Sequence, residues 1–218
     1  MTQPTITDPT DLLSILEQDR ALVIVRAKQI ADPAALARAL AAGGIRLVEF
    51  TFTTPTVLDV IKTCAEVPET VVGAGTVLTA EQAEQAIGAG ARFLVTPDLR
   101  PQVAEVARRT GTPLFMGALT PTEVSAAVEL GAAAVKIFPA GLGGPGHLRA
   151  LLGPFPDLRL VPTGGVNAGN ARTFLDAGAF AVGAGSDVVV PDLVERGEHG
   201  EITRRAADFV RALKEPAA

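Results

Sequence analysis

Tryptophan and tyrosine are absent from this chain of 218 residues, and phenylalanine occurs only nine times. The hydrophobic core must therefore consist mostly of Ala, Val, Leu and Ile, which is feasible because 48% of the residues are hydrophobic. Cysteine occurs once, as Cys64, so no disulfide can form within the chain. Cys64 lies in a helix-like segment, and we interpret it as a packing residue rather than a nucleophile.

Basic clusters and long apolar segments are also missing. The net charge is −5, and without a basic run we expect no binding to nucleic acid or to an anionic membrane surface. The longest apolar runs have the length of a strand, so we expect no membrane-spanning segment. Residues 1–4 show no basic segment followed by an apolar one, which predicts no signal peptide and a cytoplasmic protein. His147 and His199 lack partners at ligand spacing, so we expect no metal ion and two solvent-facing side chains.

Strand-like and helix-like segments alternate along the chain at intervals of roughly 20–25 residues. Short apolar runs predict strands at 21–26, 45–50, 71–73, 92–95, 113–116, 133–139, 158–161 and 180–182. Helical patterns follow at 12–18, 33–42, 54–66, 80–89, 101–109, 121–130, 147–152, 168–177 and 201–213. Several helices end in Ala-Gly or Leu-Gly, where glycine suits a left-handed C-cap, as at Gly43, Gly90, Gly131 and Gly178.

Eight strand–helix units predict a closed (β/α)₈ TIM barrel with an extra short N-terminal helix. An open, doubly wound sheet is the alternative. It is less favoured because the repeat is regular and no Gly-x-Gly-x-x-Gly follows the first strand. No linker is visible, so we expect one domain over residues 1–218, with 1–8 as a loose tail.

Lysine is scarce, and one lysine stands in an unusual place. Three of the four lysines, Lys28, Lys62 and Lys214, lie in loop-like or amphipathic helical segments. Lys136 lies inside the apolar run 133–139, where a charged amine is costly unless it is paired or loses its proton. A neutral amine in such a place is a nucleophile toward carbonyl groups. The alternatives are a side chain that reaches out from a strand end, or a structural ion pair, and this run alone leaves them open.

Chemistry in TIM barrels is found at the C-terminal ends of the strands, where this chain places several polar residues. Glu49 lies in an apolar context that should raise the pKa of its carboxyl and suit a general acid or base. Alternatively, Glu49 forms a structural ion pair with Arg26 or Lys136. Arg26, which ends the first strand, could bind a carboxylate or phosphate, or form a salt bridge at the barrel end.

Two glycine-rich turns follow the last two strands, at 163–165 and 183–186. Glycine lets the backbone approach a ligand closely, so its N–H groups can bind phosphate. Either turn alone is ordinary turn chemistry. Because both occur after strands seven and eight, where many barrels bind phosphate, together they favour a phosphate site.

Taken together, the strand ends resemble those of the KHG/KDPG aldolase family, where KDPG is 2-dehydro-3-deoxy-6-phosphogluconate. The matching segments are VEFTFT (48–53), GAGTV (73–77), VTP (95–97), KIFP (136–139), VPTGGVN (161–167) and VGAGS (182–186). The resemblance implies a class I aldolase, a carbon–carbon lyase that works without metal or cofactor and forms a homotrimer. Its substrate would be a phosphorylated 2-keto-3-deoxy sugar acid, cleaved to pyruvate and glyceraldehyde 3-phosphate.

The resemblance also implies roles for single residues. Lys136 would form the Schiff base, and Glu49 would be the general acid/base. Thr76 would help to hold the pyruvyl carboxylate, and Thr163 is typical of the enzymes for glucose-derived substrates. The remaining expected substrate-binding residues are Arg26, Pro97, Phe138, Gly164, Gly165, Gly185 and Ser186, of which the three glycines and Ser186 would bind phosphate.

One position departs from part of the family. Some members carry an arginine four residues after the catalytic glutamate, and this chain has Thr53 there. Other members have an arginine at the end of strand one instead, which Arg26 matches. Arg26 is therefore expected to bind the carboxylate or a hydroxyl group of the substrate.

Other functions stay open at this point. A phosphate-binding isomerase or synthase could use Lys136 as an electrostatic group only, and a barrel without activity could bind a phosphorylated metabolite as a sensor. Within the aldolases, the substrate could be KDPG, its C4 epimer in the 6-phosphogalactonate series, or the shorter 4-hydroxy-2-oxoglutarate, which has no phosphate.

Overall fold

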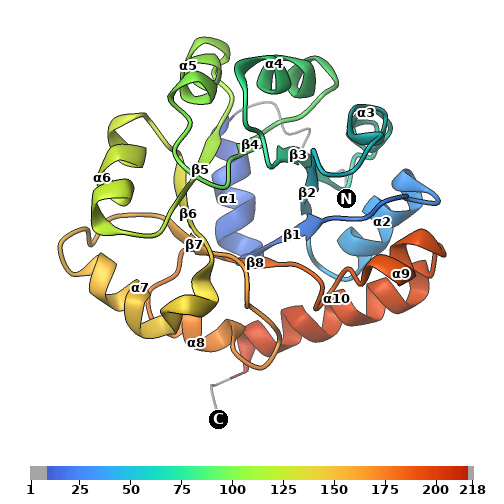
Figure 1. The fold of residues 1–218 in the computed structure, drawn as a ribbon. Coiled ribbons are helices and arrows are strands. Elements are labelled where there is room, and N and C mark those ends of the chain that lie inside the picture. Colours follow the sequence, from blue (N-terminus) through green and yellow to red (C-terminus); the bar gives the residue numbers. More distant parts are fainter. Residues whose placement is uncertain (1–8, 216–218) are drawn as a thin grey trace.

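Eight parallel strands form a barrel inside a ring of helices (Figure 1). The computed structural model describes residues 9–215. The strands hydrogen-bond in the order β7-β6-β5-β4-β3-β2-β1-β8, and a bridge between Thr163 and Gly183 brings the two ends together. Their bounds are β1 Ala21–Val25, β2 Leu47–Thr51, β3 Val71–Gly75, β4 Leu94–Val95, β5 Leu114–Ala118, β6 Ala134–Ile137, β7 Leu160–Pro162 and β8 Val182–Ala184. The predicted (β/α)₈ TIM barrel is confirmed.

The helices cover the outside of the barrel, and α1 packs at the end where the strands begin. They are α1 Pro9–Asp19, α2 Pro33–Ala42, α3 Val57–Ala65, α4 Ala80–Gly88, α5 Pro101–Thr110, α6 Pro121–Glu129, the 3₁₀ turn η1 Ala140–Leu142, α7 Gly144–Leu152, α8 Ala171–Asp176, α9 Pro191–Glu195 and α10 His199–Lys214. Leu12, Ile15 and Leu16 of α1 join the cluster of side chains that fills the base of the barrel. The predicted extra N-terminal helix is therefore present.

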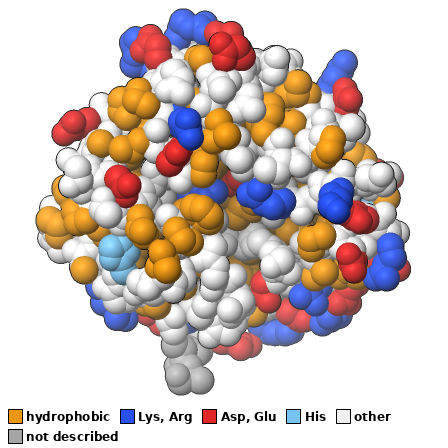
Figure 2. All heavy atoms as spheres, viewed as in Figure 1, with side chains coloured by type: hydrophobic (Ala, Val, Ile, Leu, Met, Phe, Trp, Pro, Cys, Tyr) orange, Lys and Arg blue, Asp and Glu red, His pale blue; other side chains and the backbone are white. Residues whose placement is uncertain are grey.

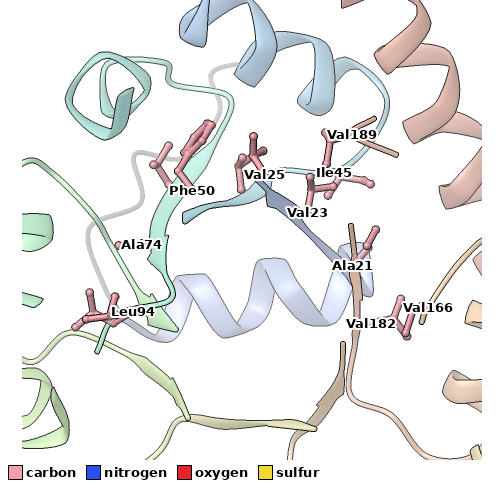
Figure 3. Packing of buried hydrophobic residues seen from close by; sticks show 14 of the residues in the cluster. Ala21, Val23, Val25, Ile45, Phe50, Ala74, Leu94, Val166, Val182 and Val189 are labelled. Atoms are coloured by element: carbon pink, nitrogen blue, oxygen red, sulfur yellow. The ribbon is translucent and has the colours of Figure 1, made fainter. Parts of the chain in front are cut away.

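Most strands divide their side chains between two apolar clusters, because successive residues point to opposite faces. Val23 and Val25 of β1 point outward and pack beneath the helices, together with Ile45 and Val189 (Figure 3). Their neighbour Ile24 points inward and joins the cluster inside the barrel. Both faces of the sheet are thus buried, which explains the nearly continuous apolar runs of the strands.

The predicted helix ends need correction at several places. Helix α3 begins at Val57 rather than at 54, because the Thr54 hydroxyl donates to the carbonyl of Ala27 instead of capping the helix. Helix α7 begins at Gly144, and α8 begins at Ala171. Neither η1 nor α9 was predicted, since each is too short to show helical periodicity.

Two further expectations about single residues were wrong in detail. Gly90, Gly131 and Gly178 have positive φ as predicted, but after α2 the left-handed residue is Gly44 rather than Gly43. His147 is half-buried rather than solvent-facing, and its Nε2 lies 2.7 Å from the carbonyl oxygen of Leu119.

Cys64 is buried, and its thiol donates to the carbonyl of Pro33. Burial raises the pKa of this thiol to about 12, which agrees with a packing residue rather than a nucleophile. Over residues 9–215, none of the helices combines the length and the apolar character that crossing a membrane requires. The expected tail at 1–8 lies outside the described residues.

Candidate active site

Lys136 and Glu49 meet inside the barrel because of the alternation along their strands. The neighbours of Lys136 on β6, Val135 and Ile137, point outward into the core beneath the helices, so Lys136 points inward. The same parity turns Glu49 of β2 inward. Strands β2 and β6 lie four places apart in the sheet, on opposite sides of the barrel. The two side chains therefore approach each other across the interior, with Lys136 Nζ 3.7 Å from Glu49 Oε1.

The Glu49 carboxylate is sealed from solvent, with 1% of the residue exposed, and neither of its oxygens has a hydrogen-bond partner within the described residues. Burial raises the pKa of Glu49, while the positive charges of Lys136 and Arg26 act in the opposite direction. A carboxyl that is buried without a hydrogen bond, beside the amine of Lys136, is suited to exchanging a proton.

Glycines on the inward face of the barrel make room for these side chains. A Cβ atom at Gly75 of β3 would lie 1.8 Å from Glu49 Oε1, and one at Gly73 would lie 2.4 Å from the ring of Phe93. On β5, a Cβ atom at Gly117, the residue paired with Lys136, would lie 2.2 Å from the backbone of Pro97. The glycines of β3 and β5 thus leave room for larger groups that fill the barrel.

We expect Gly75→Ala to disturb the Glu49 carboxylate directly. Because the surrounding side chains are buried, the clash should cost about 1–3 kcal/mol of unfolding free energy and displace the acid/base group. Denaturant unfolding and steady-state kinetics would measure both effects. Gly88→Ala in α4 is the control, since no heavy atom lies within 4 Å of its added Cβ. Equal behaviour of the two variants would contradict the steric role of Gly75.

A pocket of about 510 Å³ opens at the C-terminal ends of the strands, above Lys136. Figure 2 shows this face of the barrel, with blue Lys and Arg side chains near its centre. Lys136 lines the pocket with all nine residues predicted to bind substrate, which are Arg26, Thr76, Pro97, Phe138, Thr163, Gly164, Gly165, Gly185 and Ser186. Glu49 is not among the lining residues, so it lies behind the lysine. The structure brings the predicted site together, and the role of each residue stays a prediction.

Arg26 is held at one side of the pocket by two threonine hydroxyls. Its guanidinium donates to Thr53 Oγ1 at 3.0 Å and to Thr76 Oγ1 at 3.4 Å. Thr53 also lies 2.7 Å from Thr51 Oγ1, so the hydroxyls form a connected network. Thr53 stands at the position where some members of the family that the sequence resembles carry an arginine, and here it accepts a hydrogen bond from Arg26, which directly follows β1. Thr76 has an unusual backbone conformation for a residue other than glycine, with φ of 55°.

The two glycine-rich turns, which follow β7 and the adjoining β8, form a further part of the pocket wall. Gly164 and Gly165 both have positive φ, and a Cβ at Gly164 would lie 3.0 Å from the ring of Phe138. The Phe138 ring in turn lies 5.5 Å from Lys136 Nζ. Thr163 is buried, and its hydroxyl donates to the Val161 carbonyl at 3.3 Å. The glycines therefore bring backbone close to both the aromatic ring and the pocket.

Six lining residues were not predicted: Ile24, Val166, Asn167, Gly183, Asp187 and Arg205. Val166, Asn167 and Gly183 lie inside the matching segments 161–167 and 182–186 although they were not named as binding residues, and Asp187 directly follows Ser186. Ile24 lies two residues before Arg26 on the same face of β1, which strand periodicity could have indicated. Arg205 belongs to α10, and no local pattern connects that helix with the strand ends. Over residues 9–215, no three His, Cys, Asp or Glu side chains form a group that could hold a metal ion.

Comparison with known proteins agrees with this geometry. The sequence model of the family described as KDPG and KHG aldolase matches residues 12–205. The 2-dehydro-3-deoxy-phosphogluconate aldolase of Treponema pallidum is 37% identical over 197 residues, covering 88% of this chain and 92% of the relative. The KHG/KDPG aldolase of Escherichia coli K12 is 35% identical over 207 residues, covering 94% and 97%.

A solved structure of KDPG aldolase from Legionella pneumophila superimposes on this fold with a TM-score of 0.84. It is 29% identical, covers 90% of this chain and 97% of its own, and holds pyruvate as a covalent carbinolamine intermediate. The family match, the relatives and the fold agree over most of the chain. The chain therefore belongs to the KDPG and KHG aldolase family.

Proposed function

We propose that this chain is a class I aldolase that cleaves 2-dehydro-3-deoxy-6-phosphogluconate to pyruvate and glyceraldehyde 3-phosphate. The observation that carries the proposal is the Lys136–Glu49 pair at the base of the pocket, with 3.7 Å between Nζ and Oε1. One group is an amine that can attack a carbonyl, and the other is a carboxyl that can move a proton. No third reactive group is needed for the reaction.

The first half of the reaction joins the substrate to the lysine. The unprotonated Nζ of Lys136 attacks the C2 ketone and forms a carbinolamine, which loses water to give an iminium ion. Glu49 is the group beside Nζ that can take up and return the protons of these steps. The covalent carbinolamine of pyruvate in the Legionella relative supports this route.

The second half breaks the carbon–carbon bond. Glu49, directly or through a water molecule, removes the proton of the C4 hydroxyl, and the C3–C4 bond breaks as its electrons move into the iminium. Glyceraldehyde 3-phosphate leaves, and the enamine on Lys136 is protonated at C3. Hydrolysis of the resulting iminium releases pyruvate and restores the amine.

The two sides of the pocket suit the two ends of such a substrate. The guanidinium of Arg26, held by Thr53 and Thr76, would bind the carboxylate next to the C2 ketone. The glycine-rich turns at 164–165 and 185–186 would bind the phosphate through backbone N–H groups. Thr163 directly precedes Gly164 in the pocket wall, and by the family resemblance a threonine at this position favours the glucose-derived substrate over its C4 epimer.

The test is reduction of the protein with borohydride in the presence of pyruvate, followed by mass spectrometry of the peptide that contains Lys136. We expect a reduced pyruvyl adduct on Lys136, together with release of pyruvate from 2-dehydro-3-deoxy-6-phosphogluconate in a coupled assay. If the folded protein forms no adduct, the better interpretation is a phosphate-binding barrel enzyme that works without a Schiff base. The homotrimer and the cytoplasmic location are further proposals, supported by the family resemblance alone.

A further inference from the structure

Arg205 lines the pocket although it comes from α10, the last helix of the chain. Its Nε and Nη2 both donate to the backbone carbonyl of Asp187, at 3.0 Å and 2.7 Å. Asp187 directly follows Ser186 in the turn after β8. Helix α10 lies on the outside of the barrel, next to α8 and α9 (Figure 1). The guanidinium is therefore fixed next to the turn that is expected to bind phosphate.

The rest of this guanidinium is only weakly engaged. Its Nη1 lies 3.7 Å from Glu201 Oε1, beyond hydrogen-bond distance. The Glu201 carboxylate instead binds Arg204, at 2.8 Å and 2.6 Å. The Arg205 side chain is 30% exposed, so a ligand in the pocket has access to part of it. Arg205 thus keeps donor capacity after the two bonds to Asp187 are made.

Charge at this side of the pocket also points to a role for Arg205. The other lining cations are Arg26, which follows β1, and Lys136 of β6, and the proposed function assigns them to the carboxylate and the ketone of the substrate. The glycine-rich turns carry no charge, and Asp187, whose Oδ2 accepts from the backbone N–H of Ala168, adds a negative one. Without Arg205, an arriving phosphate dianion would meet neutral donors beside a carboxylate.

We propose that Arg205 determines the specificity of this site for phosphorylated substrates by donating a charged hydrogen bond to the phosphate group. The proposal rests on the proposed function and adds to it a residue that supplies positive charge to the glycine-rich turns. Planar guanidinium groups suit phosphate, and Arg205 can use Nη1 for the ligand while Nε and Nη2 stay on the Asp187 carbonyl. Substrates without phosphate gain nothing from this contact.

The experiment compares Arg205→Gln with wild type on 2-dehydro-3-deoxy-6-phosphogluconate and on 4-hydroxy-2-oxoglutarate, which has no phosphate. For the phosphorylated substrate we expect KM to rise about 10- to 100-fold with kcat nearly unchanged, since a hydrogen bond to a charged group is lost. Kinetics with 4-hydroxy-2-oxoglutarate should not change. Arg204→Gln is the matched control, because Arg204 adjoins Arg205 on α10, does not line the pocket and contacts Glu201 and Asp208.

Two further measurements distinguish a direct contact between Arg205 and the phosphate from a role of Arg205 in anchoring the turn at Asp187. They also distinguish failure of this proposal from failure of the proposed function. Arg205→Lys should recover part of the affinity, because it keeps the charge and loses the paired bonds to Asp187; a lysine variant as impaired as the glutamine variant would overturn the direct contact. Equal losses of activity on both substrates would also overturn the direct contact.

Binding of inorganic phosphate, measured by calorimetry, needs no turnover and should weaken in Arg205→Gln. If the wild-type protein binds phosphate but cleaves neither substrate, this result refutes the aldolase proposal and does not refute the phosphate contact of Arg205.

Discussion

Replacing Lys136 with alanine should abolish aldol cleavage while leaving the barrel folded. Without Nζ no iminium can form, and loss of a covalent nucleophile typically lowers turnover on the order of 10⁴-fold or more. The fold should survive because Glu49 can respond by binding a proton. The Lys136 charge lowers the pKa of Glu49, so removing that charge raises the pKa further and leaves a neutral carboxyl in the barrel.

The variant would be tested by coupled kinetics, circular dichroism and borohydride trapping with pyruvate. Lys62→Ala is the control, since Lys62 is an exposed lysine on α3, away from the pocket. We expect an adduct in wild type and in the control, and no adduct in Lys136→Ala. Substantial turnover by a folded Lys136→Ala protein would remove the Schiff base from the mechanism.

Replacing Glu49 with glutamine should slow turnover about 100- to 10,000-fold, the usual contribution of a general acid or base. Glutamine has nearly the same shape and fits the space that Gly75 provides, so the change removes proton transfer rather than packing. Some iminium can still form, because the amine of Lys136 remains. Borohydride trapping with pyruvate should therefore give the adduct at a reduced rate. Cleavage of the sugar acid substrate in a single turnover should be far slower than this trapping. A wild-type rate in this variant would exclude Glu49 as the acid/base.

The pH dependence gives an independent check on Glu49. Bond cleavage needs the ionised carboxylate, so kcat/KM should fall as pH falls through the pKa of Glu49. Burial raises that pKa above its ordinary value of 4.5, so the acid limb should lie above pH 4.5. The limb should be lost in Glu49→Gln, because glutamine does not titrate. A limb that persists unchanged in the variant belongs to another group.

The sequence alone determined the architecture and indicated Lys136 and Glu49 as the candidate reacting pair. Strand and helix periods are local properties, so eight units and a barrel could be inferred from spacing and from glycine at helix ends. Lys136 stood out because a charge in an apolar strand is energetically costly, and Glu49 for the same reason. The parity of each strand then required both side chains to share the inner face of the barrel.

The sequence could not supply the contacts between segments that are distant in the chain. It showed Thr53 at a position where some family members carry an arginine and predicted that Arg26 takes over the role of that arginine. Only the structure shows the hydroxyl of Thr53 accepting a hydrogen bond from Arg26. The helix expected at 54 starts three residues later because the Thr54 hydroxyl donates to the carbonyl of Ala27, in the loop between β1 and α2.

Arg205 is the clearest case of a feature that tertiary structure decided. Its neighbours on α10 show ordinary amphipathic spacing and many charges, so its sequence context resembles that of a solvent-facing arginine. It reaches the pocket because α10 packs against α2, α8 and α9, and the turn after β8 offers the carbonyl of Asp187. Local periodicity fixes which face of an element is buried, whereas the packing of whole elements decides which polar groups meet at the site.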